Sequence, residues 1–276
     1  MFGLLHTGDS YQSQTEHLVH CTQTYLKLCY GNARDIFELA KENRELISFW
    51  AKNRERSQES RSNLEKQKNA EKVEDQIQEY YRELIIHSCT TKLYASFSLE
   101  SFINAFATFL TNRKILVSVQ DEAKETILHY ISRLYDKMST LDKWEEVAAQ
   151  FGSTQLNKRT ILWKKFCELY RFRDSAVHDK PIFIRRTGDV VQIKRGVIRQ
   201  VKVESKETSA IARYINDAYQ ACKTHDDMIR KLYTITGVKE EEGNTQFYVL
   251  PNNYHRRIKT VVKKLEELEQ QIKAGY

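Results

Sequence analysis

The sequence predicts a mainly α-helical protein with one small β insertion. Only two prolines and nine glycines occur in 276 residues, and the helix-forming residues Leu, Glu, Lys, Gln and Arg fill long runs. Apolar residues recur at spacings of three and four, as in amphipathic helices. After Pro181 this period changes to short runs rich in β-branched residues. We therefore expect a helical bundle with a small antiparallel hairpin or meander.

The N-terminal region is expected to be helical from about residue 15 to residue 50. Residues 1–14 look irregular, and Gly31-Asn32 is expected to divide the helical stretch in two. Residues 51–72 contain almost nothing apolar. We expect a partly ordered helix there, with a flexible connector as the alternative.

Four helices are predicted in the middle of the chain, at about 73–110, 121–138, 142–151 and 158–181. The second half of the first one, LYASFSLESFINAFATFL, is apolar almost all round, which indicates a central, buried helix. Pro181 is expected to stop the last one, because the residue before a proline disfavours helical dihedrals.

The runs IFIRRT, VVQIK and VIRQVKV form the predicted β insertion, a basic flap at 182–203. A helix at about 209–234 follows, and a last helix extends from about 251 to 273. The last helix carries a short heptad-like seam, which fits either a dimer contact or packing within the chain. We expect three regions: an N-terminal extension (1–72), a helical bundle with the flap (73–235), and a C-terminal loop and helix (236–276).

The net charge of +7 is concentrated in one region. Between Lys158 and Val203 there are thirteen Lys and Arg against four Asp and Glu, a balance of +9, so the rest of the chain carries −2. This favours a polyanionic partner, first of all nucleic acid, with a solvated basic surface as the alternative. The basic residues expected to contact phosphates are Lys180, Arg185, Arg186, Lys194, Arg195 and Arg199.

Other features exclude several classes of protein. No apolar run approaches the roughly 18 residues of a membrane-spanning helix, and the N-terminus lacks the pattern of a signal peptide. The five cysteines are scattered and odd in number, which indicates reduced thiols in a cytoplasmic protein. His17, His20 and Cys21 could share a helix face, but no set of residues has convincing metal-ligand spacing. We therefore expect no metal and no cofactor.

The candidate active site lies at the end of the 158–181 helix, where Arg171, Arg173, Asp174 and His178 cluster. On a helical wheel Arg173 falls within the apolar stripe, about 140° from His178, whereas Arg171 and His178 lie within about 20° of each other. An arginine in an apolar stripe needs a carboxylate or a phosphate to balance its charge, because the guanidinium stays protonated.

Glu100, with Asn104 one turn later, interrupts the buried helix and is the expected partner of Arg173. The alternative for Glu100 is that it faces a groove open to water. The alternative for the whole cluster is a helix C-terminus decorated with Arg and His, which that end favours electrostatically.

This set of side chains suits phosphoryl transfer better than acyl transfer, because it contains no nucleophilic Ser or Cys. An RNA 2′-hydroxyl can serve as the internal nucleophile. The enzyme then supplies proton transfer by His178 and a cation, Arg173, for the charge that develops on phosphorus.

The segment R-D-S-A-V-H, Arg173–His178, matches the R-x(4–6)-H motif of the HEPN superfamily, and YASFSLESFINAF, Tyr94–Phe106, resembles the first core helix of many HEPN proteins. The resemblance covers roughly 73–235. It implies a HEPN-like helical bundle that dimerises and brings two motifs together in one cleft. It also implies Arg173 and His178 as catalytic residues, Asp174 as a supporting residue and Arg171 as the reserve arginine.

The resemblance further implies a metal-independent endoribonuclease that leaves 2′,3′-cyclic phosphate and 5′-hydroxyl ends. Many members of the superfamily act as toxins or in antiviral defence, so an antitoxin or another regulatory protein is a possible partner. Other members only bind or act as scaffolds. A non-catalytic RNA- or nucleotide-binding module, or a dimeric scaffold, is therefore the alternative function.

Overall fold

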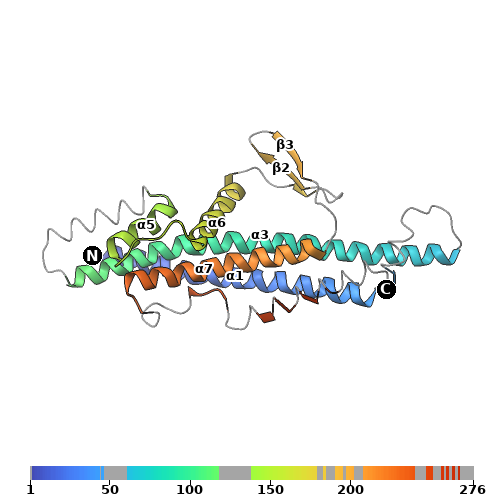
Figure 1. Cartoon of the computed structure of the whole chain (residues 1–276), viewed down its shortest axis with the longest axis horizontal. Coiled ribbons are helices and arrows are strands. Elements are labelled where there is room, and N and C mark those ends of the chain that lie inside the picture. The colour runs from blue at the N-terminus through green and yellow to red at the C-terminus, as the bar shows by residue number, and fades with distance from the viewer. Residues whose placement is uncertain are drawn as a thin grey trace. The chain divides into compact units, whose positions relative to one another are not determined.

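The computed structural model describes residues 2–43, 45–46, 61–117, 138–178, 183–184, 190–194, 197–201, 208–239 and 247–250, and single positions between 256 and 267. The predicted helix at 121–138 lies outside these residues except at Met138, and so do residues 51–60 and most of the last predicted helix. The mainly helical class is confirmed (Figure 1). The helices are α1 (Phe2–Glu42), α3 (Arg61–Val117), α5 (Thr140–Phe151), α6 (Ile161–His178) and α7 (Thr208–Thr236).

Three short strands lie in sequence between α6 and α7. They are β1 (Phe183–Ile184), β2 (Val190–Lys194) and β3 (Val197–Val201). They form one antiparallel sheet in the order β1-β2-β3, and β2 and β3 form a hairpin in which Lys194 pairs with Val197 and Val190 with Val201.

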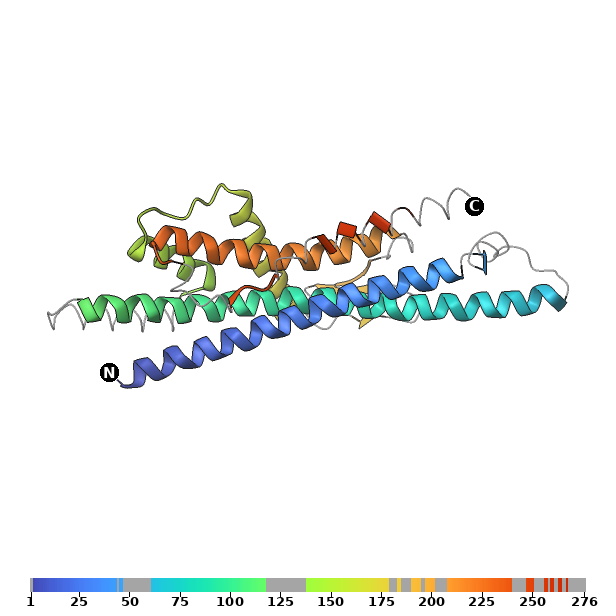
Figure 2. The same ribbon diagram turned by 90° about the horizontal axis from the view of Figure 1, so that it is seen from below.

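The chain falls into two compact units, and each is built from separate stretches of sequence. The first comprises Met1–Gln23, Lys92–His178 and Ala221–Leu250, and the second comprises Thr24–Thr91, Asp179–Gln220 and Pro251–Tyr276. In each unit a part of α3 packs beside a part of α1 and a part of α7 (Figure 2). The expected boundary between residues 72 and 73 falls inside the continuous helix α3.

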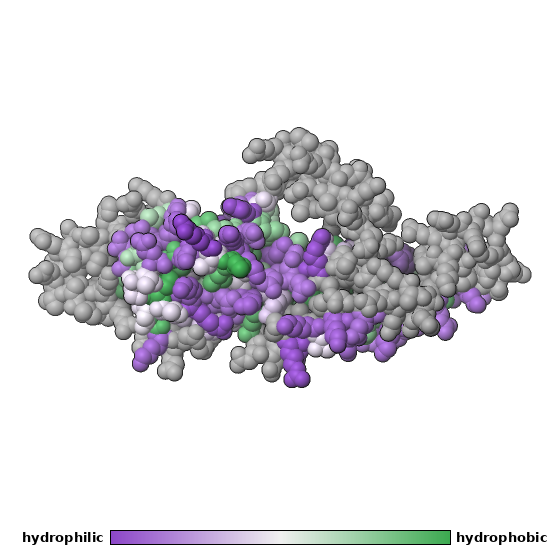
Figure 3. Space-filling model, viewed as in Figure 1, coloured by the Kyte–Doolittle hydropathy of each residue, from purple (hydrophilic) through white to green (hydrophobic). Residues whose placement is uncertain are grey.

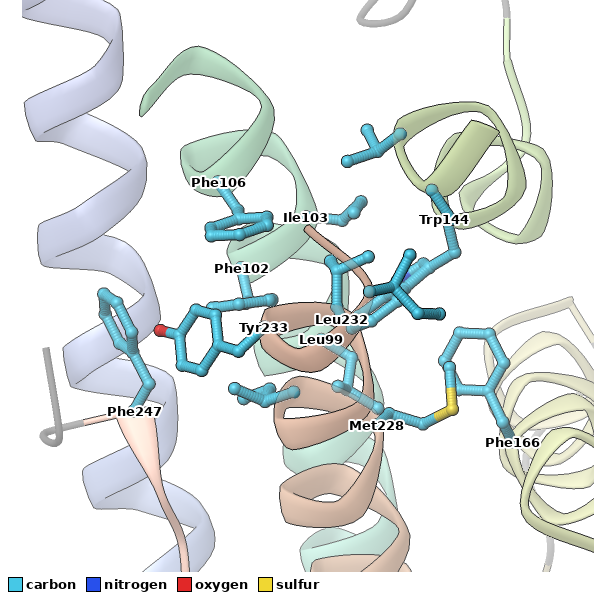
Figure 4. Close-up of a cluster of buried hydrophobic side chains, with 14 of the residues drawn as sticks. Leu99, Phe102, Ile103, Phe106, Trp144, Phe166, Met228, Leu232, Tyr233 and Phe247 are labelled. Atoms are coloured by element: carbon cyan, nitrogen blue, oxygen red, sulfur yellow. The ribbon is translucent and has the colours of Figure 1, made fainter. Parts of the chain in front are cut away.

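The core of the first unit is an aromatic cluster that joins α3, α5, α6 and α7 (Figure 4). Phe102 of α3 is fully buried, and its ring centroid lies 5.8 Å from that of Trp144 in α5 and 5.9 Å from that of Tyr233 in α7. Trp144 in turn meets Phe166 of α6 edge to face, with centroids 5.3 Å apart. Four elements are therefore held around one apolar centre, as aromatic packing of this kind favours.

Local signals set the ends of α5. Ser139 caps its N-terminus, because the side-chain oxygen accepts a hydrogen bond from the backbone N–H of Asp142. At the other end, a Cβ on Gly152 would collide with the carbonyl oxygen of Ala148 and with the side chain of Ile235. Ser153 then donates its backbone N–H to the carbonyl of Ile235 (2.9 Å), which ties the end of α5 to the end of α7.

Two N-terminal predictions are wrong. Residues 2–14 are helical, not irregular, because α1 begins at Phe2. Gly31 and Asn32 do not break the helix either: the Asn32 side chain donates to Glu83 Oε2 (3.3 Å) and lies 3.2 Å from His87 Nδ1 on α3. Because Cys29 and Ala33 are also fully buried on this face, packing outweighs the roughly 1 kcal/mol that a glycine costs inside a helix.

The helices α5, α6 and α7 lie close to their predicted places. α3 begins at Arg61 and ends at Val117, so the helix predicted for 73–110 extends further in both directions, and residues 61–72 are helical. In the described part of the chain, no helix is both long enough and apolar enough to cross a membrane. Hydrophilic residues cover most of the described surface in the view of Figure 3.

Candidate active site at the end of α6

The position of α6 follows from its apolar face. Trp163, Phe166, Leu169 and Tyr170 are buried at spacings of three and four, and Thr160 accepts the backbone N–H of Trp163 at the start of the helix (3.2 Å). The same spacing leaves the last two turns with a polar composition. The candidate residues therefore stand at the C-terminal end of a helix that is fixed by its own core face.

Arg173 and Glu100 form an ion pair between α6 and α3. Arg173 Nη2 lies 2.8 Å from Glu100 Oε2, and the two side chains are 24% and 31% exposed. The predicted pairing is confirmed, but Glu100 is only partly buried, so the expectation of a buried carboxylate is corrected. The apolar stripe ends at this point of the helix, and water therefore reaches both charges.

A second carboxylate and two aromatic rings complete the surroundings of Arg173. Nη1 of Arg173 donates to Asp174 Oδ1 (3.2 Å), and the Asp174 side chain is 58% exposed. The guanidinium carbon lies 5.7 Å from the ring centroids of both Phe97 and Tyr170. The Nε atom is buried and has no hydrogen-bond partner among the described residues. The charge of Arg173 is thus already balanced by carboxylates in this structure.

Tyr170 fixes this end of α6 against α3. Its hydroxyl donates to the backbone carbonyl of Ser96 (3.0 Å). Burial, followed by the nearby charge of Glu100, raises the pKa of Tyr170 well above its ordinary value. The hydroxyl stays protonated at neutral pH, so Tyr170 has a structural role here.

Asn104, predicted as a supporting residue one turn from Glu100, bonds to α5. It is buried, and its side-chain oxygen accepts a hydrogen bond from the Nζ of Lys143 on α5 (3.1 Å); that lysine is 5% exposed. Asn104 therefore connects α3 to α5, one turn away from Glu100. Glu100 and Asn104 therefore bond to different helices, Glu100 to α6 and Asn104 to α5.

The point at which α6 ends determines whether Arg173 and His178 lie on the same side of the helix. The backbone is helical through His178, so the chain does not unwind before it. Five helical residues place the two positions about 140° apart around the axis. One copy of α6 therefore presents positions 173 and 178 on different sides.

Several predicted phosphate-binding residues lie outside the described residues. These are Lys180, Arg185, Arg186 and Arg195. The side chain of His178, predicted as catalytic, is also outside the described ones. The backbones of Lys194 and Arg199 belong to β2 and β3, but their side chains are not among the described ones. The predicted role of the flap stays a prediction.

Sequence reasoning missed a buried polar network in the same unit. His225 Nδ1 lies 2.9 Å from Asp226 Oδ1, and His225 Nε2 lies 3.0 Å from Ser98 Oγ. Asp226 also accepts the backbone N–H groups of Val249 (2.8 Å) and Leu250 (2.9 Å). Because a carboxylate only accepts hydrogen bonds, Nδ1 of His225 carries a proton.

This network has the residue types of a Ser-His-Asp triad, but all three side chains are nearly or fully buried. With no route to substrate, we assign it a structural role: it joins α3, α7 and the segment 247–250. A signal for it was present in the sequence. His225 and Asp226 interrupt the apolar stripe of Cys222, Ile229 and Tyr233 just as Glu100 interrupts its own helix.

The described residues contain no group of three or more His, Cys, Asp or Glu side chains that could hold a metal ion. His17 and Cys21 come together on α1, with Nε2 and Sγ 3.6 Å apart, and form a pair only. All five cysteines are free thiols.

Comparison with protein-family models, with curated proteins and with solved structures finds nothing that matches this chain. The HEPN resemblance therefore rests on the motif at Arg173–His178 and on the helix at Tyr94–Phe106, and it enters the function below as a proposal.

Proposed function

We propose that this chain is a metal-independent endoribonuclease of HEPN type. The observation that carries the proposal is the ion pair between Glu100 and Arg173, which holds a guanidinium at the end of α6, five residues before His178. A held cation and an imidazole are the two kinds of group that cleavage by the RNA's own 2′-hydroxyl requires. The biological setting implied by the resemblance is antiviral defence or a toxin–antitoxin pair.

The chemistry follows from these two groups. A base removes the proton of the 2′-hydroxyl, whose oxygen attacks the adjacent phosphorus. The bond to the 5′-oxygen breaks as that oxygen gains a proton, which leaves a 2′,3′-cyclic phosphate and a 5′-hydroxyl. His178 serves in proton transfer, and Arg173 stabilises the negative charge on the non-bridging oxygens, where a planar guanidinium donates to two of them at once.

Positions 173 and 178 lie about 140° apart on one helix, so one copy cannot bring both side chains to the same phosphate. A second copy of the chain can supply the missing group. In a homodimer with two α6 helices facing each other, His178 of one copy reaches the phosphate that Arg173 of the other copy holds. Two imidazoles then share the acid and the base steps, one accepting a proton and one donating it. The proposal therefore includes a homodimer.

One observation favours the alternative, a non-catalytic RNA- or nucleotide-binding module or a dimeric scaffold. Both terminal nitrogens of Arg173 already contact carboxylates, Glu100 and Asp174. An RNA phosphate must displace Asp174 to reach the guanidinium. This displacement costs little, because the Asp174 side chain is 58% exposed and surface ion pairs contribute about 0–1 kcal/mol.

The deciding experiment incubates purified protein with RNA in excess EDTA and analyses the product ends. Cyclic phosphate ends support attack by the 2′-hydroxyl, whereas 5′-phosphate ends indicate a water nucleophile. We expect His178→Ala and Arg173→Lys to abolish cleavage and leave the fold intact. We expect Glu100→Gln to slow cleavage, because Arg173 loses the charge that positions it.

His20→Ala is the matched control, since it removes an exposed imidazole from α1 and should leave cleavage unchanged. If the wild-type protein cleaves no RNA with or without EDTA, the enzyme is refuted and the binding module is retained.

A further inference from the structure

The side of α6 that faces away from its apolar residues carries two cations in line with position 178. Lys164 and Arg171 are both exposed and are seven residues apart. His178, the last residue of the helix, follows after another seven. Seven residues turn an α-helix by only about 20° from a whole number of turns, so the three positions lie nearly in line. We call Lys164, Arg171 and position 178 the α6 row.

Two cations near the α6 row, Arg173 and Lys158, are paired with carboxylates. Arg173 contacts the carboxylates of Glu100 and Asp174, and Lys158 Nζ lies 2.6 Å from Glu145 Oε2. Lys164 and Arg171, in contrast, form no ion pair with any described residue.

Glu168, the acid between them on the same side, is also exposed and pairs with neither. An i,i+4 pair between Lys164 and Glu168 would contribute only about 0.3–0.5 kcal/mol. The row therefore presents two cations to the solvent at a fixed spacing, and neither is paired with a carboxylate of the described residues.

The spacing of the row matches a nucleic-acid backbone. Seven residues at a rise of 1.5 Å advance by about 10 Å along the helix. Successive phosphates of a stacked strand advance by roughly 3.4 Å each, so one step of the row spans about three nucleotides. A row one side chain wide contacts one strand at a time, so a single RNA strand is sufficient to occupy it.

We propose that Lys164 and Arg171 contact the backbone phosphates of a single RNA strand that runs along α6 towards its C-terminal end. Arg171 contacts a phosphate about three nucleotides from the one at position 178, and Lys164 contacts one about six nucleotides away. This inference rests on the proposed function, because it names the path by which the same substrate reaches His178. It adds a binding site that does not involve the β flap.

The test measures the salt dependence of RNA binding. A fluorescent, fully 2′-O-methylated 12-nucleotide RNA is the probe, because it cannot be cleaved through a 2′-hydroxyl. Its dissociation constant is measured by fluorescence anisotropy across a salt series. Each phosphate contact with a single strand contributes about 0.7 to the log–log slope, so the double variant Lys164→Ala/Arg171→Ala should lower the slope by about 1.4.

The matched control is Arg82→Ala/Lys231→Ala. It removes the same two side-chain types from exposed positions on α3 and α7, where neither forms an ion pair with a described residue. Its slope should equal that of the wild-type protein. Because all four side chains are exposed, both double variants should keep the wild-type melting temperature.

The outcomes separate this inference from the proposed function. If the two double variants have the same slope while the wild-type protein binds and cleaves RNA, the α6 row is refuted alone. If the slope falls as expected but unmodified RNA is not cleaved, the row stands and the ribonuclease is refuted. If the wild-type protein binds no RNA at any salt concentration, both are refuted.

Discussion

Replacing Asp226 by Asn tests the buried network most sharply, because the two side chains differ by one charge and almost nothing in size. Oδ1 of Asp226 accepts from His225 and from the Val249 N–H, and Oδ2 accepts from the Leu250 N–H. An asparagine has one oxygen and one NH2 group. With its oxygen in the Oδ1 position, two hydrogen bonds survive, and the NH2 group faces the Leu250 N–H.

One hydrogen bond to a charged acceptor is therefore lost, and one donor is left facing another. Hydrogen bonds of this kind contribute about 1.5–3 kcal/mol. The Leu250 end of the network is half-buried, so water compensates part of the loss. We expect Asp226→Asn to lower the free energy of unfolding by about 2 kcal/mol. Asp226→Ala removes every acceptor from a buried site and should cost about 3–5 kcal/mol.

The neighbouring residue provides the control. Asp227 is 32% exposed and forms ion pairs with Lys223 and Arg230 on the surface of α7. Asp227→Asn should therefore cost less than about 1 kcal/mol. Urea denaturation followed by far-UV circular dichroism gives both values. If Asp226→Asn and Asp227→Asn agree within about 0.5 kcal/mol, the network does not hold segment 247–250 in place.

Two further predictions concern assembly and alkaline pH. Static light scattering at micromolar concentration should give twice the chain mass of 32.6 kDa, and a monomer under these conditions would contradict the shared site. Burial raises the pKa of the Cys29 thiol to about 12, so the folded state favours the neutral thiol. The resulting stability is present in full below about pH 9 and is lost as the pH rises towards 12. Cys29→Ala should therefore flatten the alkaline loss of stability, and Cys21→Ala, at a less buried position, should not.

The parts of the fold that the sequence predicts best are those with a clean apolar period. The helices α5, α6 and α7 lie within a few residues of their expected ranges. The pairing of Arg173 with Glu100 was also predictable, because each residue is a charge placed within an apolar stripe of its own helix.

The parts that sequence reasoning misplaces depend on contacts between distant residues. Gly31 and Asn32 look like a break, yet Asn32 bonds to α3 more than fifty positions later in the chain. The role of Asp226 depends on backbone N–H groups of segment 247–250, which no local pattern reveals. Local propensity is a weak guide where tertiary packing decides the outcome.

The discontinuous make-up of the first unit has a consequence for its synthesis. Phe102 and Phe106 leave the ribosome well before Met228, Leu232 and Tyr233, the α7 residues that cover them. At about 5–20 residues per second, the roughly 120 intervening residues take on the order of 6–24 seconds to be made. During that time the most apolar part of α3 has no α7 to pack against. We therefore expect this apolar part of a nascent chain to be a binding site for chaperones until α7 emerges.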